Sequence, residues 1–292
     1  MKHNLKITII ILSMFLISQV IGLYVVNSYS NTKALPYGMQ ANIPASSGNG
    51  LISIIFSLIF AILIIFLLTK YKSKIVMKSW FFLVTVLALG VTFVSFFSPI
   101  KAVSLWVLIL AVPLAFFKIY KRNILIHNIT EILIYPGIAA IFVPLLNIIG
   151  IIILLVIISI YDMWAVWKSK IMIKMANYQM KELKILGGFM IPYLSKAQKK
   201  KIKKMNKQEL KKKRIKAKVG ILGGGDVVFP MISAGVVLVY WGLIPAIITT
   251  LGALLGLSLL LFFSEKKKAY PAMPFITAGV FLAFLINWLF VI

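Results

Sequence analysis

Cysteine is absent from this 292-residue chain, and acidic residues are scarce, with six Asp and Glu against 32 Lys and Arg. Without cysteine the chain can form no disulfide, no thiolate metal site and no cysteine nucleophile. Its two histidines, His3 and His127, lie far apart in sequence, and each is predicted to be a surface residue near a helix end. The sequence therefore predicts no metal site and no cofactor.

Hydrophobic residues are abundant, at 61% of the chain, and the mean hydropathy is +1.02. Apolar runs of about 20 residues match the thickness of a bilayer core, and several such runs occur. They lack the period-2 alternation of an outer-membrane barrel. The predicted fold class is therefore all-α, and the chain is predicted to be an integral, multi-pass (polytopic) membrane protein.

Nine apolar segments can be drawn as transmembrane helices. They are Leu5–Val26, Leu51–Leu68, Ser79–Phe97, Ala102–Phe117, Ile129–Val143, Asn147–Trp167, Val219–Trp241, Leu243–Phe263 and Met273–Ile292. With a cytoplasmic N-terminus, 30 of the 32 basic residues fall on the cytoplasmic side, and only Lys33 and Lys101 fall outside. This partition predicts nine spans, with the N-terminus cytoplasmic, the C-terminus outside and the cell membrane as the location.

The one sizeable polar insertion is the segment Lys168–Lys218, which holds 18 basic residues. Its first part has lysines at helical spacing and is predicted to form an interfacial helix that ends at Gly187-Gly188. Its second part is predicted to lie on anionic lipid headgroups, and a nucleic-acid partner is disfavoured. The chain thus divides into a six-helix bundle (1–167), a basic cytoplasmic loop (168–218) and a three-helix part (219–292).

Two of the six acids lie where a charge is costly. Glu131 follows Asn128-Ile129-Thr130 and is interpreted as part of a capping box at a helix start. Asp162 and Asp226, by contrast, lie inside apolar spans, where a carboxylate costs about 2.5–3.5 kcal/mol and indicates a functional site. Counted along a helix from the basic loop, they lie at depths of roughly 9 and 12 Å, so the two carboxylates can meet.

Two carboxylates in contact share a proton, so one can act as an acid while the other acts as a base. With a water molecule between them, they form the catalytic apparatus of an aspartic protease. Gly223, Gly224 and Gly225 remove side chains beside Asp226, which would let a substrate backbone approach and pair. The alternative for the glycines is close helix packing. The segment Pro271-Ala272-Met273-Pro274 opens the last span and would leave backbone groups available to a ligand.

These three motifs together resemble the presenilin and signal peptide peptidase family of intramembrane aspartyl proteases. Tyr161-Asp162 is similar to the family's YD motif, Gly223-Gly224-Gly225-Asp226 to GxGD, and Pro271-Ala272-Met273 to PAL with Met in place of Leu. The resemblance implies that Asp162 and Asp226 are catalytic and that the other motif residues shape substrate binding. The small, cysteine-free, lysine-rich chain resembles an archaeal presenilin homologue.

By the same resemblance, the basic loop gives this chain the presenilin orientation, and the expected substrates are single-span membrane proteins with the N-terminus outside. Two alternatives remain at this point. One is a proton- or cation-coupled transporter or leak pathway that uses the paired aspartates, although no internal repeat is evident. The other is a noncatalytic membrane scaffold packed through its glycines. The sequence leaves open whether the chain forms a homo-oligomer.

Overall fold

The fold is described from a computed structural model. It describes residues 5–30, 35–37, 52, 56–57, 60, 74–97, 103–121, 123–168, 179, 187–193, 218–264 and 270–291. Most of the predicted second span, the interfacial helix predicted before Gly187 and most of the basic run before Lys218 lie outside these residues.

Helices make up most of the described chain. They are α1 (Leu5–Ser30), α3 (Lys74–Phe97), α4 (Val103–Tyr120), α5 (Ile124–Phe142), α6 (Ile148–Met163), α10 (Gly225–Trp241), α11 (Leu243–Phe263) and α12 (Met273–Phe290). A 3₁₀ turn (Val143–Leu145) follows α5, and a π-helical turn (Trp164–Lys168) extends α6. Six of these helical segments are long and apolar enough to cross a membrane, and α4 and α10 are shorter apolar helices. The chain is a mostly helical, polytopic membrane protein.

Local sequence signals set several helix boundaries. The side chain of Asn147 accepts a hydrogen bond from the backbone N–H of Gly150 and caps α6. Asn123 caps α5 in the same way, through the N–H of Leu125 at 2.9 Å. Gly242, with a φ of 95°, ends α10 and leads directly into α11, a conformation that glycine adopts at little cost.

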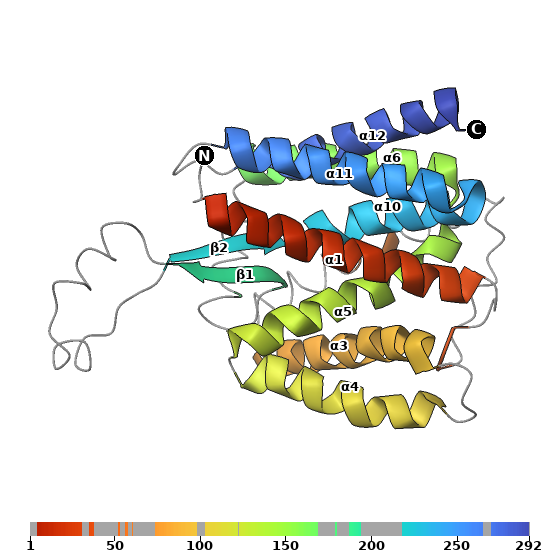
Figure 1. The fold of residues 1–292 in the computed structure, drawn as a ribbon. Helices are drawn as coiled ribbons and strands as arrows, with labels where there is room; N and C mark the ends of the chain where they lie inside the picture. Colours follow the sequence, from red (N-terminus) through yellow and green to blue (C-terminus); the bar gives the residue numbers. More distant parts are fainter. Residues whose placement is uncertain are drawn as a thin grey trace, which may run out of the picture.

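The helices run alongside one another, with α3 and α4 at one side of the bundle and α6, α11 and α12 at the other (Figure 1). Between these groups lie α1, α5 and α10. Helix α10 is the central element, since it packs against α1, α5, α6, α11 and α12. The start of α1 and the end of α12 lie at opposite ends of the bundle.

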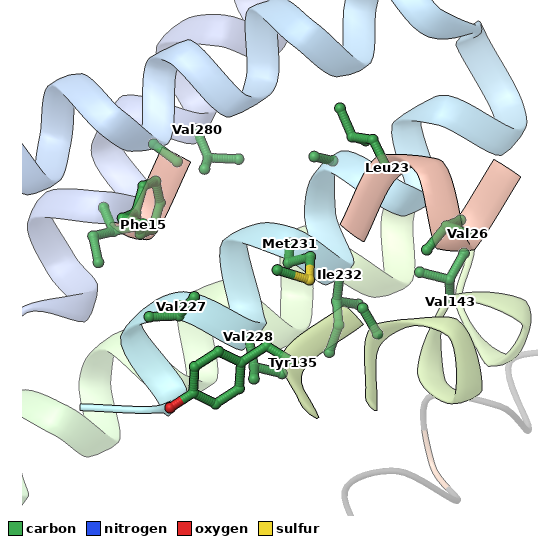
Figure 2. Close-up of a cluster of buried hydrophobic side chains, with 14 of the residues drawn as sticks. Phe15, Leu23, Val26, Tyr135, Val143, Val227, Val228, Met231, Ile232 and Val280 are labelled. Atoms are coloured by element: carbon green, nitrogen blue, oxygen red, sulfur yellow. The ribbon is translucent and has the colours of Figure 1, made fainter. Parts of the chain in front are cut away.

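The core forms where α1, α5 and α10 meet, and it is built from tightly packed apolar side chains (Figure 2). Phe15 of α1 and Met231 of α10 are fully buried there, and Tyr135 of α5 closes one side. The outward faces of the helices carry many exposed Leu, Ile, Phe and Trp side chains. An apolar exterior around a packed core is the arrangement that a lipid environment stabilises.

Buried polar side chains link neighbouring helices. The hydroxyls of Ser159 and Thr277 hydrogen-bond at 2.8 Å and join α6 to α12. The side chain of Gln19 in α1 donates to the carbonyl of Val227 in α10 at 2.9 Å. Such bonds hold helices together in hydrocarbon, where apolar contact between helices gives little driving force.

The all-α prediction was wrong in one respect, because the chain also forms a β-hairpin. Strand β1 (Gly188–Tyr193) pairs antiparallel with β2 (Lys218–Gly223), with Gly188 opposite Gly223. The predicted seventh span therefore begins not at Val219 but at the start of α10, and the boundary drawn between residues 218 and 219 falls within β2. Residues 188 and 223 are far apart in sequence, so no local periodicity revealed their pairing.

The capping box predicted at Glu131 was also wrong, since α5 starts earlier, at Ile124. Glu131 lies inside the helix, is 1% exposed and forms an ion pair of 2.9 Å with Lys118 of α4. His127, predicted to be a surface residue, is buried as well. The charge of Lys118 on the neighbouring helix is what makes a buried glutamate tolerable at this position.

We predict that Gly252→Ala lowers the stability of the protein, because a Cβ at Gly252 would overlap the backbone carbonyl of Gly279 where α11 packs on α12. Overpacking of this kind costs about 1–3 kcal/mol of unfolding free energy. Thermal unfolding in detergent measures the change. Gly187→Ala is the control, since its added methyl group meets nothing within 4 Å. Equal stability of the two variants would contradict this account of the packing.

Candidate active site

Asp162 lies near the end of α6 and is buried, with 6% of its surface exposed. The backbone N–H of Met273 donates to its Oδ2 at 3.0 Å, and the backbone of Ala272 lies beside it. Ala272 and Met273 lie at the start of α12, where the first N–H groups of a helix have no partner within the helix. The Pro271-Ala272-Met273 motif thus contacts Asp162 through its backbone.

Asp226 is the second residue of α10 and follows directly from the hairpin. The positive end of a helix dipole favours a carboxylate in the first turn. The backbone of Gly223, the last residue of β2, lies next to the Asp226 carboxylate. Since α6 packs against α10, Asp162 and Asp226 come close enough for their charges to interact.

The three glycines before Asp226 have different surroundings. A Cβ at Gly223 would lie 3.1 Å from Oδ2 of Asp226, and a Cβ at Gly224 would lie 3.0 Å from the hydroxyl of Tyr135. A Cβ at Gly225 would make only an ordinary contact, 3.5 Å from the ring of Phe229. The first two glycines therefore leave room for the aspartate and for Tyr135, whose hydroxyl points to the start of α10 in Figure 2.

Pro230 lies one helical turn after Asp226, inside α10. Because proline has no N–H, the carbonyl of Asp226 lacks the hydrogen bond that residue i+4 normally donates in a helix. The backbone at the aspartate therefore keeps an acceptor that a water molecule or a substrate N–H could use.

The structure brings together Asp162, Asp226, Gly223, Ala272 and Met273, all predicted from the sequence as site residues. Pro271 is buried beside this group. Tyr161 lies differently, since it is 44% exposed on α6 and its ring lies 6.3 Å from that of Trp164. A role for Tyr161 in substrate binding stays a prediction. Within the described ranges, no group of three or more His, Asp or Glu side chains could hold a metal ion.

A polar stripe on α5 was missed as part of this region. His127 lies against Gly188 O of β1 at 2.8 Å, and Tyr135 lies against Gly224. Glu131 lies between them, and its Oε1 is 3.7 Å from Nε2 of His127. The four-residue spacing of His127, Glu131 and Tyr135 places them on one helix face, and this regular spacing in an otherwise apolar span could have revealed them.

The family profile described as "Signal-peptide peptidase, presenilin aspartyl protease" matches residues 12–292. The chain belongs to this family. It is a presenilin-family intramembrane aspartate protease, and the resemblance seen in its motifs is confirmed. None of the curated proteins matches it.

Two solved structures have a similar fold. One is a presenilin family intramembrane aspartate protease in space group C222, with a TM-score of 0.65 and 21% identity, covering 96% of this chain and 98% of that one. The other, in space group P2, has a TM-score of 0.63 and 22% identity, covering 95% of this chain and 96% of that one. At these identities the likeness establishes the shared fold of this protease.

We predict that Gly223→Ala reduces the turnover of this protease more than Gly225→Ala does. The new methyl group at position 223 would lie 3.1 Å from Oδ2 of Asp226, so the carboxylate would have to shift by a few tenths of an ångström. We expect a severalfold loss, since a misplacement of about 1 Å can cost roughly 100-fold in rate. At position 225 the methyl group has room. Cleavage of a purified single-span substrate in detergent measures both rates. If both variants cut at the same rate, the space beside Asp226 has no influence on the site.

Proposed function

We propose that Asp162 and Asp226 are the catalytic pair of this protease and that they hydrolyse a peptide bond by activating a water molecule. The observation that carries the proposal is that the two carboxylates lie close together on the packed helices α6 and α10, with Asp162 held by the backbone N–H of Met273. Two such carboxylates do not both ionise readily, so the pair shares one proton.

The reaction follows from that shared proton. The ionised carboxylate takes a proton from water, the water oxygen attacks the substrate carbonyl carbon, and the protonated carboxyl gives its proton to the carbonyl oxygen. On collapse of this intermediate the C–N bond breaks, the amine leaves with the proton that the pair took from water, and one hydroxyl of the diol returns its proton to the other carboxylate, which restores the singly protonated pair.

The outer edge of β2 is the surface that we assign to the substrate strand. The side chain of Asn128 in α5 bonds both the N–H and the C=O of Met190, so these groups of β1 point away from β2. Residues opposite one another in an antiparallel pair alternate between bonded and non-bonded pairs. Ile221, opposite Met190, therefore directs its own N–H and C=O away from β1.

In the described part of the chain the sheet has only these two strands, so the edge at Ile221 is open. An unwound substrate segment needs partners for its backbone groups, because lipid offers none. Strand addition at this edge would supply them. The edge leads directly through Gly223 and Gly224 to Asp226, which would bring the bound strand to the catalytic pair.

We also propose a membrane topology from the distribution of the basic residues. It has nine spans, a cytoplasmic N-terminus, an outer C-terminus and a location in the cell membrane. The segment 168–218 then lies on the cytoplasmic side of the helix bundle, where β1 packs against α5, and we assign anionic lipid headgroups as the partners of its lysines. We assign single-span membrane proteins with the N-terminus outside as substrates, cut in the cytoplasmic third of their span. The opposite ends of α1 and α12 support an odd number of spans (Figure 1).

Asp162→Asn and Asp226→Asn are each expected to abolish cleavage, because a lone carboxylate cannot be both acid and base. The measurement is the release of defined fragments from a purified single-span substrate. Thermal unfolding is the control, since both variants should remain folded. Near-normal turnover by either variant would reject the pair, and a transporter would give no fragments even with the wild-type protein.

Ile221→Pro is expected to lower turnover by up to about tenfold, because it removes one outward N–H at the edge assigned to the substrate, a bond worth about 0.5–1.5 kcal/mol. The hairpin should persist, since this N–H makes no bond to β1. Val219→Pro is the matched control, because Val219 faces the same way but lies farther from Asp226 along β2. Equal losses in the two variants would contradict docking beside Ile221.

A further inference from the structure

Helix α5 holds the hairpin through two neighbouring side chains. The carboxamide of Asn128 donates to the carbonyl of Met190 at 2.8 Å and accepts from the N–H of Met190 at 2.9 Å. One residue earlier, Nε2 of His127 donates to the carbonyl of Gly188 at 2.8 Å. These bonds occupy the outer edge of β1, so α5 takes the place that a third strand would have on that side.

The carboxamide of Asn128 has the same donor and acceptor as a backbone peptide group. With Met190 it therefore forms the same pair of hydrogen bonds, one donated and one accepted, that a residue of a neighbouring antiparallel strand would form. A single residue bonded in this way fixes where β1 lies along α5. The apolar side chains of β1 support the same placement, since Phe189 is fully buried and Ile191 is 8% exposed.

The position of β1 affects the catalytic site, because β1 pairs with β2 and β2 leads to Asp226. Met190 lies opposite Ile221, and two residues later β2 ends at Gly223, where an added Cβ would lie 3.1 Å from Oδ2 of Asp226. A shift of β1 along α5 would therefore move the open edge of β2 relative to the catalytic pair. The strand bound at that edge would move with it.

We propose that Asn128 is a positioning residue that determines which peptide bond of the substrate is cut, by fixing the hairpin against α5. The inference rests on the proposed docking of the substrate at β2. Asn128 touches no reacting atom, so its loss should alter the distribution of cut positions more than it alters the chemistry of the cut.

The test compares the fragments made from one purified single-span substrate, mapped by mass spectrometry. Asn128→Asp has nearly the same shape but loses the donor to the Met190 carbonyl. For this variant we expect the ratio of the main cut to its neighbours to fall roughly two- to tenfold, as expected for the loss of about one net hydrogen bond. Asn128→Gln keeps the carboxamide and should retain more of the wild-type pattern than Asn128→Asp does.

Thr130→Val is the matched control for a polar change on the same helix. Thr130 is fully buried, and its hydroxyl bonds only the carbonyls of its own helix, at Ile126 and His127. Its cut pattern should equal that of the wild type. An unchanged pattern in a folded Asn128→Asp variant would overturn the proposal, as would an equal change in Thr130→Val.

The absence of cysteine allows a second test within one folded sample. Asn128→Cys and Met190→Cys are combined, and the two thiols are joined by a short bifunctional thiol reagent. Before joining, the cut pattern should be broad, and after joining it should narrow again. No change on joining would overturn the proposal even if the point variants did not fold. The proposed catalytic pair is tested separately, by comparing total cleavage by Asp226→Asn with that by the wild type. We expect no cleavage by the variant and normal cleavage by the wild type.

Discussion

The change from strand to helix between Gly223 and Gly225 is the constraint on which the site depends. Only one residue, Gly224, separates the end of β2 from the first turn of α10. A side chain at Gly223 would press on the Asp226 carboxylate, and one at Gly224 would press on Tyr135. Glycine is therefore needed here for space, and the open strand edge and the aspartate become neighbours along the chain.

A hydrocarbon environment explains how the surrounding backbone is arranged. Every backbone N–H and C=O inside a membrane needs a partner, and irregular chain is tolerated only where protein supplies one. The start of α12 meets this need by donating to Asp162, and β1 meets it through the side chains of α5. In the described part of the chain, no third strand covers the outer edge of β2. On the proposed function, the unwound substrate supplies the partners for this edge.

Much of the helical architecture was predictable from local sequence. The sixth segment was drawn from Asn147, and α6 is capped by that residue, because an apolar run after an Asn defines a helix start. The depths of Asp162 and Asp226 followed from the charge partition, and the structure brings the two carboxylates together. The Pro271-Ala272-Met273 segment was predicted to offer free backbone groups, and the N–H of Met273 binds Asp162.

The sequence by itself determined the apolar helices, the place of each aspartate on them and the family motifs, because these depend on composition and short-range spacing. Only the tertiary structure decided that residues 188–193 pair with 218–223, and that Glu131 is buried against Lys118 rather than capping a helix. It also decided that Asn128 bonds to Met190. Each of these contacts joins separate elements, so its free energy depends on how the helices pack, which no local pattern encodes.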